Sequence, residues 1–384
     1  MKKLVASEKE INFINGKSVE TLDSRLSMIN KQLSLFKNPY VGNKRKIIPQ
    51  IIKTLDKYNI EYKSVLDLFS GSAFVSMAMK MLGKIVYSND LLSSSYIYSL
   101  AYIENPGYIL SDEEKEALLE PVIVEEEPFL LTISDRFKER FTESEIKFLR
   151  NINFNITKVL CSNNDREECI YKSALAFACL QMYIIEKCFV GGRMSNNQVL
   201  AKVEHRLSHQ RNCGSEMTGK GIRWIGDIYP KDPNKGKHQS YNLDAISLIE
   251  QCTDEFVKNI DLVYIDPPYG GLSSDYAEMY QFFEEYFSGG KDYRNFIDIK
   301  ENGDKFVNKE NYGKNFAKMI KLLNRFPCLV ISYNNGGWAK IENILDIIKK
   351  HRKSVIVEEF DYDYKYRIQE SRDDKAKEYL IIAR

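Results

Sequence analysis

Short apolar runs alternate with amphipathic stretches at both ends of the chain but not in its middle. Apolar residues recur at helical spacing over 47–55, and an apolar run at 65–69 then ends in the glycine turn 70–72. A helical stretch through Met81 and a second apolar run at 85–87 follow. This order of strand, glycine turn, helix and strand predicts the opening βαβ unit of a doubly wound sheet.

The same pattern returns in the last third of the chain. Residues 262–266 form a buried-strand run that ends in Pro267-Pro268-Tyr269, and later strands are expected at 327–332 and 355–358, with 379–382 as an edge or final strand. Helices are expected between these strands, at 275–288, 310–325 and 338–350.

The middle of the chain breaks the alternation. Residues 111–150 contain helix-like segments with twelve acidic against six basic side chains, and 167–189 reads as one long, mostly apolar helix. We therefore expect an α/β fold, a Rossmann-like doubly wound sheet divided by an inserted, mainly helical domain. The predicted boundaries are 1–98 and 241–384 for the two parts of the catalytic domain and 99–240 for the insertion.

Length and composition agree with this division. The 384 residues exceed what one core usually organises, and the formal net charge is +1. No apolar run approaches the roughly 18–20 residues of a membrane span, and no signal peptide is evident. The seven cysteines are scattered without a C-x-x-C pair. These features predict a reduced, cytoplasmic protein.

Four polar segments follow predicted strands: 67–71, Asp90, 266–269 and 332–335. Ligands of open α/β sheets bind at the carboxyl ends of strands, so these segments should converge on one crevice. The turn at Gly71 and an acidic residue nineteen positions later suit the ribose of an adenosine cofactor. Neither a P-loop nor G-x-G-x-x-G occurs, which favours a cofactor without phosphates.

The tetrapeptide Asp266-Pro267-Pro268-Tyr269 is the most specific feature of the sequence. Two prolines after a buried strand fix the backbone and remove two N–H donors, so the corner presents mainly acceptors beside an aromatic face. Such a corner suits a planar ring with an exocyclic amino group. A rigid strand-to-loop turn is the alternative interpretation.

With these segments the chain resembles the Dam-type DNA adenine-N6 methyltransferases, the alpha group of amino-methyltransferases. The matching segments occur in the family's order: 38–44 followed by 47–51, Phe69-Ser70-Gly71, Asn89-Asp90 and D-P-P-Y at 266–269, with weaker matches at 241–244 and 332–334. Two positions depart from the family pattern: Ala73 replaces its second glycine, and Gly42-Asn43-Lys44 replaces G-G-K.

The resemblance implies S-adenosylmethionine as cofactor, double-stranded DNA as substrate and a separate restriction endonuclease as a further partner, with no membrane association. The implied catalytic residues are Asp266, Pro267, Pro268 and Tyr269. The candidate cofactor-binding residues are Tyr40, Gly42, Lys44, Asp67, Phe69, Gly71, Asp90, Asp244 and Asp266. In this interpretation adenine is flipped out of the duplex, Asp266 and the Pro267 carbonyl accept hydrogen bonds from its amino group, and the base stacks on Tyr269.

We expect the residues that select the DNA target sequence to lie in the insertion, where residues 191–240 carry nine basic against four acidic side chains. The candidate DNA-contacting residues are Tyr269, Arg193, Asn196, Asn197, Arg206 and Arg211. A metal ladder of His205, His209 and Cys213 is disfavoured by the arginines around it. The chain's net charge thus averages an acidic and a basic segment and does not argue against a nucleic-acid partner.

Three other functions remain open. An N4-cytosine methyltransferase would use the same corner, although serine more often replaces Asp266 there. An RNA or protein-glutamine methyltransferase would be expected to carry asparagine at that position. A catalytically silent DNA-binding protein is the alternative from a different class.

Overall fold

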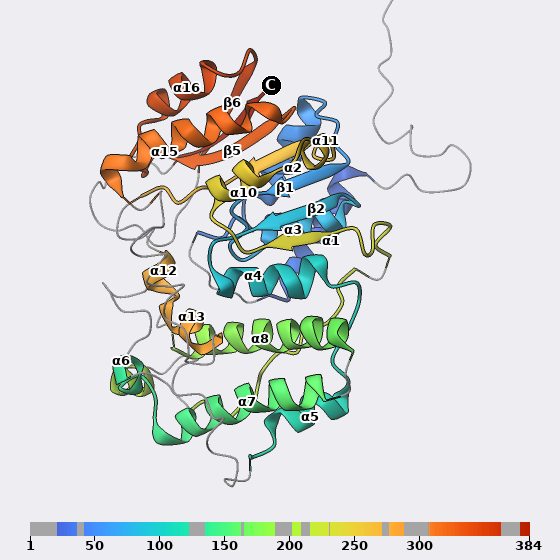
Figure 1. The fold of residues 1–384 in the computed structure, drawn as a ribbon, viewed down its shortest axis with the longest axis vertical. Helices are drawn as coiled ribbons and strands as arrows, with labels where there is room; N and C mark the ends of the chain where they lie inside the picture. Colours follow the sequence, from blue (N-terminus) through green and yellow to red (C-terminus); the bar gives the residue numbers. More distant parts are fainter. Residues whose placement is uncertain are drawn as a thin grey trace, which may run out of the picture.

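A mixed seven-stranded sheet forms the centre of the molecule (Figure 1). This computed structural model describes residues 21–36, 42–122, 135–162, 165–188, 202–208, 216–229, 231–270, 276–287, 306, 308–361 and 377–384. The strand order is β3-β2-β1-β4-β5-β7-β6. All neighbours pair in parallel except β7, which runs antiparallel to both β5 and β6. The predicted α/β class is confirmed.

Each predicted apolar run is a strand of this sheet. The strands are β1 (Ser64–Asp67), β2 (Ile85–Asn89), β3 (Gln239–Tyr241), β4 (Leu262–Ile265), β5 (Leu329–Asn334), β6 (Val355–Asp361) and β7 (Lys377–Ala383). β1 and β4 are buried along their whole length because helices cover both faces. β7 is the last strand in chain order, but it lies between β5 and β6 and not at an edge.

Helices pack on both faces of the sheet. Side chains alternate along the strands, so Val65 and Tyr264 face one core while Leu66 and Val263 face the other. Figure 1 shows α15 and α16 on one side of the sheet and α3 and α4 on the other. The helices around the sheet are α1 (Leu22–Leu33), α2 (Ile48–Lys57), α3 (Phe74–Met81), α4 (Ser93–Ser99), α10 (Ala245–Gln251), α11 (Asp254–Lys258), α15 (Lys309–Leu322) and α16 (Ile341–Lys349), with a 3₁₀ turn at Leu323–Arg325. Two further helices, α12 (Tyr276–Met279) and α13 (Gln281–Phe287), lie near α8 (Arg166–Cys188).

A helical region separates β2 from β3 in the chain. After α4 comes a π-helical turn, η1 (Leu100–Glu104), and the region then consists of α5 (Asp112–Leu119), α6 (Asp135–Lys138), α7 (Glu143–Cys161), α8 (Arg166–Cys188) and α9 (Val203–Ser208). Figure 1 shows α8 beside α4 and α7 beyond it. Apolar residues of α7 and α8 belong to the same buried cluster as one face of the sheet. The boundaries at 98 and 240 stay predictions.

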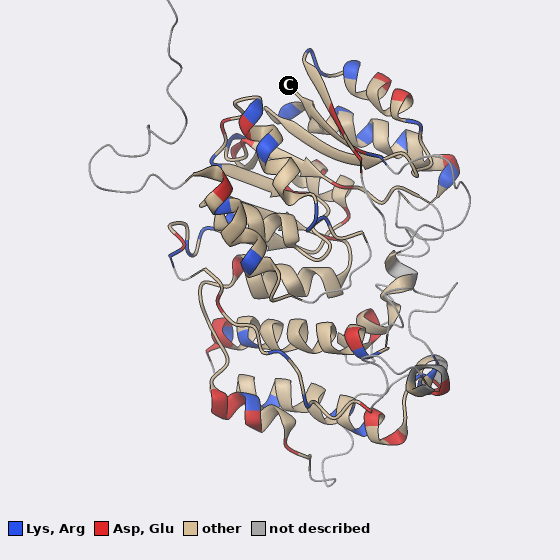
Figure 2. Ribbon diagram, turned by 180° about the vertical axis from the view of Figure 1, so that it is seen from behind, with Lys and Arg blue, Asp and Glu red and all other residues tan. Residues whose placement is uncertain are grey.

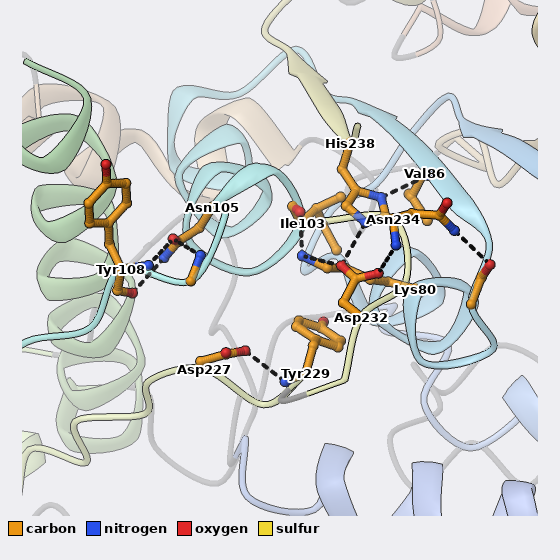
Figure 3. A network of polar contacts seen from close by, with 12 residues as sticks. Lys80, Val86, Ile103, Asn105, Tyr108, Asp227, Tyr229, Asp232, Asn234 and His238 are labelled. Atoms are coloured by element: carbon orange, nitrogen blue, oxygen red, sulfur yellow. Dashed lines mark hydrogen bonds and ion pairs between the residues drawn. The ribbon is translucent and has the colours of Figure 1, made fainter. Parts of the chain in front are cut away.

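Strand β3 was not predicted, because Gln239-Ser240-Tyr241 is too short and polar to give a strand pattern. A buried polar network holds the segment before it against β2 and α3 (Figure 3). His238 accepts a hydrogen bond from the Val86 N–H at Nδ1 (3.0 Å), and its Nε2 lies 2.8 Å from Asp232. The Lys80 ammonium donates to the Ile103 carbonyl (2.6 Å) and lies 3.7 Å from Asp232.

One expectation drawn from composition is wrong. Cys161 and Cys169 form a disulfide that joins the end of α7 to the start of α8, so not every cysteine is reduced. One described helix, α8, is long and apolar enough to cross a membrane by length and composition alone. Two thirds of its apolar window (67%) is buried inside the fold, which is the setting of a core helix.

Candidate active site

One pocket opens at the carboxyl ends of β1, β2 and β4, where the sequence places its acidic residues. Its empty volume is about 930 Å³, open solvent at its mouth included. Three of the four predicted segments line it: 67–71, Asp90 and 266–269. The fourth reaches the pocket indirectly, because Ser332 donates a hydrogen bond to Glu378, which contacts the D-P-P-Y corner. The predicted convergence of the first three segments is confirmed.

The turn after β1 brings backbone to the pocket wall. Gly71 (φ +50°) and Ala73 (φ +58°) both have left-handed backbone conformations, and α3 begins at Phe74. This conformation is strained for alanine, which explains why a glycine would suit position 73. The Ala73 N–H donates to the Ser70 carbonyl at 2.7 Å, which closes the turn.

Asp67 ends β1 and is 1% exposed. Its Oδ2 accepts a hydrogen bond from the Ser76 hydroxyl at 2.7 Å, whereas its buried Oδ1 has no hydrogen-bond partner among the described residues. Burial raises the pKa of Asp67 to about 7, against the lowering effect of the Ser76 bond. A buried carboxylate oxygen without a partner is costly, so this atom is suited to receive a donor from a ligand.

Asp90 follows β2, and backbone groups hold its half-buried carboxylate. Oδ2 accepts from the Gly71 N–H (2.8 Å) and Oδ1 from the Leu92 N–H (2.9 Å). Burial raises the pKa of Asp90 to about 6, while these two hydrogen bonds lower it. Glu284 of α13 accepts the next N–H groups, those of Ser93 (3.0 Å) and Ser94 (2.8 Å), so two carboxylates fix this loop.

Asp266 lies at the end of β4 within a group of charged and hydroxyl side chains. Its Oδ1 accepts a hydrogen bond from the Tyr269 hydroxyl (2.5 Å) and lies 3.2 Å from the Lys44 ammonium. Burial raises the pKa of Asp266 to about 6; the Lys44 charge opposes this shift and the Glu378 charge adds to it. Lys44 also contacts Glu378 at 2.8 Å.

The D-P-P-Y corner is rigid, as its two prolines predict. The Trp338 N–H donates to the Tyr269 carbonyl at 2.8 Å. The Tyr269 ring meets Tyr333 edge-on at 5.2 Å between centroids, and the Lys44 ammonium lies 4.7 Å from the centre of the same ring. A Cβ on Gly270 (φ +90°) would lie 2.1 Å from the Trp338 ring, so glycine is required there.

Sequence reasoning missed several residues of this site. Glu378 is the most important, because it is 1% exposed and contacts both Lys44 and Tyr269. A lone acid in the apolar run of β7 was the available signal. Phe306 and Tyr276 also line the pocket, and Phe306 meets Phe69 edge-on at 5.5 Å.

The remaining cofactor candidates have mixed outcomes. Gly42, Lys44, Phe69 and Asp244 line the pocket, and Asp244 also begins α10 by accepting from the Ser247 N–H at 3.0 Å. Tyr40 lies outside the described residues.

Most of the predicted DNA contacts lie outside the part of the chain that the structure describes. Arg193, Asn196, Asn197 and Arg211 are in this group, and nothing is described of the side chain of Arg206. The disfavoured metal ladder is likewise not described at His209 and Cys213, nor at the side chain of His205. Part of the basic stretch has structural partners, since Arg223 pairs with Glu186 at 2.8 Å. The acidic stretch begins at α5, whose first turn carries three acids, and Figure 2 shows acidic residues on the helices far from the sheet.

A mixed sheet of this order, with a pocket of strand-end carboxylates and a D-P-P-Y corner, defines a candidate methyltransferase site. The model of the D12 class N6 adenine-specific DNA methyltransferase family matches residues 40–171, a span that includes Lys44, the glycine turn and Asp90.

Individual relatives extend the similarity along the chain. The type II methyltransferase M2.HphI of Haemophilus parahaemolyticus is 28% identical over 353 residues, which cover 89% of this chain and 96% of that protein. The modification methylase StsI of Streptococcus sanguinis (25% identical) and the type II methyltransferase M.FokI of Planomicrobium okeanokoites (27% identical) align with 83% and 81% of this chain. The alignments cover 47% of each of these two relatives.

The matches confirm the resemblance predicted from the sequence. They also support the predicted activity, adenine-N6 methylation of DNA in restriction–modification.

Proposed function

We propose that the pocket binds S-adenosylmethionine beside a flipped-out adenine, and that the chain methylates N6 of that adenine at specific sites in double-stranded DNA. The observation that carries the proposal is the convergence of Asp67, Asp90 and Asp266 on one pocket. The first two lie beside the glycine turn and the third belongs to the rigid D-P-P-Y corner. The pocket therefore has a cofactor end, formed by Asp67 and Asp90, directly beside a base end, formed by Asp266 and the D-P-P-Y corner.

The residues present fit this cofactor. The unpartnered Oδ1 of Asp67 suits the ammonium group of the methionine part. Asp90 accepts a backbone N–H at each oxygen and a further hydrogen bond from the Ser95 side chain, and its remaining acceptor capacity suits a ribose hydroxyl. When bound, S-adenosylmethionine supplies a methyl group activated by a sulfonium. The carboxylates around it favour a positively charged ligand.

The base end is suited to an amino group that must become nucleophilic. Both described contacts of Asp266 fall on Oδ1, so Oδ2 is the oxygen we assign to the adenine N6–H. The Pro267 carbonyl accepts the second N6–H, and together these bonds turn the nitrogen lone pair away from the ring. Methylated N6 carries an extra proton, which Asp266, with its pKa of about 6, can take up.

Positioning supplies most of the rate advantage in this proposal, and well-oriented reactants can gain on the order of 7–11 kcal/mol. Extrusion of the base costs a few kcal/mol. We assign the candidate contacts Arg193, Asn196, Asn197, Arg206 and Arg211 to the DNA, and the region 99–240 to target recognition. A cognate restriction endonuclease as partner and a cytoplasmic location complete the proposal.

The decisive experiment maps methylated adenines in DNA from a host that expresses this protein, with the purified protein and tritiated S-adenosylmethionine as the matching assay in vitro. We expect N6-methyladenine at one recurring sequence. Methylation at N4 of cytosine would replace the proposed base, and cofactor binding without any transfer would point to a silent DNA-binding protein.

A further inference from the structure

The base end of the pocket contains a buried carboxylate that the proposed mechanism does not use. Glu378 lies on β7, where it pairs with Asn334 of β5 on one side and Phe360 of β6 on the other. The residues that follow it in the strand are apolar and buried. A charge in the interior of a sheet is unfavourable unless partners compensate it, so its contacts indicate what it is for.

The side chain of Glu378 contacts the D-P-P-Y corner directly through Tyr269 and indirectly through Lys44. Its Oε1 accepts hydrogen bonds from the Ser332 hydroxyl (2.5 Å) and the Lys44 ammonium (2.8 Å), and it lies 3.2 Å from the Tyr269 hydroxyl, whose single hydrogen it shares with Asp266. The same ammonium lies 3.2 Å from Asp266, and the same tyrosine hydroxyl donates to Asp266 at 2.5 Å. Lys44 and Tyr269 therefore bridge Glu378 and Asp266, two carboxylates on non-adjacent strands.

Stability alone does not explain this arrangement. Buried ion pairs often contribute nothing compared with apolar side chains of the same volume, because desolvation offsets the attraction. An apolar residue at 378 would leave the Lys44 ammonium with Asp266 as its remaining described carboxylate. Lysine would then compete with the substrate amino group for the oxygen atoms of Asp266.

We propose that Glu378 is a positioning residue of the methyl-transfer site, which holds Lys44 and Tyr269 so that Asp266 is oriented and ready to accept the adenine amino group. This inference rests on the proposed function. Glu378 acts through Lys44 and Tyr269 and does not touch the reacting atoms. Ser332 completes the arrangement, because its hydroxyl fixes the oxygen of Glu378 that both partners share.

The test compares E378Q, E378A and S332A with the wild-type protein in single-turnover transfer of tritiated methyl groups to DNA, between pH 5 and 8. Glutamine keeps the shape and an acceptor oxygen but removes the charge. The charged and titratable groups around Asp266 are Lys44, Glu378, Tyr269, Asp67 and Tyr264. Since the Glu378 charge raises the pKa of Asp266, E378Q should move the acidic limb of the rate profile to lower pH.

We expect E378A to lower the transfer rate about 10–100-fold and E378Q less, with cofactor affinity within twofold of the wild type. S332A should lower the transfer rate about two- to fivefold. Its effect should not add to that of E378Q, because both substitutions act on the carboxyl group of residue 378. Glu359, exposed and paired with Lys377 at 2.6 Å, provides the matched control, and E359Q should match the wild type.

Thermal melting and cofactor titration of each variant separate a positioning role from a folding defect. The positioning role would be overturned if the acidic limb of the rate profile is unchanged in E378Q, or if the variants lose rate only because less of the protein is folded. The proposed function would still stand in that case, provided that the wild-type protein is active. Wild-type protein that binds the cofactor and transfers no methyl group to DNA would overturn both.

Discussion

The two ends of the pocket use the same residue type in different electrostatic settings. At the cofactor end, the described partners of Asp67 and Asp90 are neutral donors, a serine hydroxyl and backbone N–H groups. At the base end, Asp266 already lies beside the Lys44 ammonium, which a second carboxylate also contacts. Among the described residues, no cation pairs with the carboxylates of the cofactor end, so a ligand can supply one there, whereas the base end contains Lys44 and is suited to a neutral base.

This comparison predicts which substitution affects which step. The largest effect is expected at the base end. Asp266→Ala should lower methyl transfer by at least about 10²–10³-fold, because it removes the acceptor that orients N6. Binding of DNA and of S-adenosylmethionine should persist, which filter binding and calorimetry can measure. Substantial turnover by this variant in a tritiated-methyl assay would contradict the assignment of the base end.

At the cofactor end, Asp67→Asn should weaken S-adenosylmethionine binding about 10–100-fold, since a hydrogen bond to a charged group contributes roughly 1.5–3 kcal/mol. The transfer rate at saturating cofactor should change little. Calorimetric titration measures the affinity. A variant with normal affinity and a slow transfer step would reverse the roles of the two ends.

The raised pKa values of the buried carboxylates should also give the protein a pH dependence. The pKa values of Asp67 (about 7) and Asp90 (about 6) lie above those of an unfolded chain, so their stabilising contribution is lost as pH rises through about 6–7. The ligand-free protein should therefore melt at a lower temperature at pH 8 than at pH 5.5.

The affinity for the cationic cofactor should instead increase with pH, because the cofactor binds the ionised carboxylates. We expect affinity on the order of tenfold higher at pH 8 than at pH 5.5, measured by thermal shift or calorimetry. The Asp67→Asn variant serves as control and should flatten this dependence. Affinity that falls with rising pH would show that these carboxylates do not face the positive charge.

The smallest effect is expected in the glycine turn. Ala73→Gly removes the strain of a left-handed alanine and should stabilise the protein by about 0.5–1 kcal/mol, a rise of roughly 1–2 °C in Tm. Cofactor affinity should stay the same or improve slightly. A lower Tm, measured by calorimetry, would mean that the loss of the buried methyl group outweighs the relief of strain.

Much of the sheet could be predicted because its buried strands are continuous apolar runs, as at 65–69 and 262–266. The pocket followed from the rule that strand ends converge, since Asp67, Asp90 and Asp266 each stand directly after a strand. Strand β3 was not predicted because its three residues show no apolar pattern. Pairing with β2 and the buried network around His238 hold it in place instead.

Pairings between distant residues could not be predicted from local pattern. Glu378 meets Lys44 across 334 positions, and the register of β5 with β7 brings it there. Cys161 and Cys169 are eight positions apart, but only the break between α7 and α8 brings them together. In each case the sequence identifies a reactive or charged side chain, but only the fold determines which residue it contacts.

The place of β7 in the sheet has a consequence for synthesis on the ribosome. Strand β6 is made first, but its described neighbour in the sheet is β7, so it must wait for residues 377–383 before it can pair. At about 5–20 residues per second, β1, β2 and β4 emerge well before Glu378 does. A nascent chain can therefore form the cofactor end while its base end still lacks Glu378, the second carboxylate beside Lys44, and the positioning that we propose for Glu378 begins only once this late strand inserts.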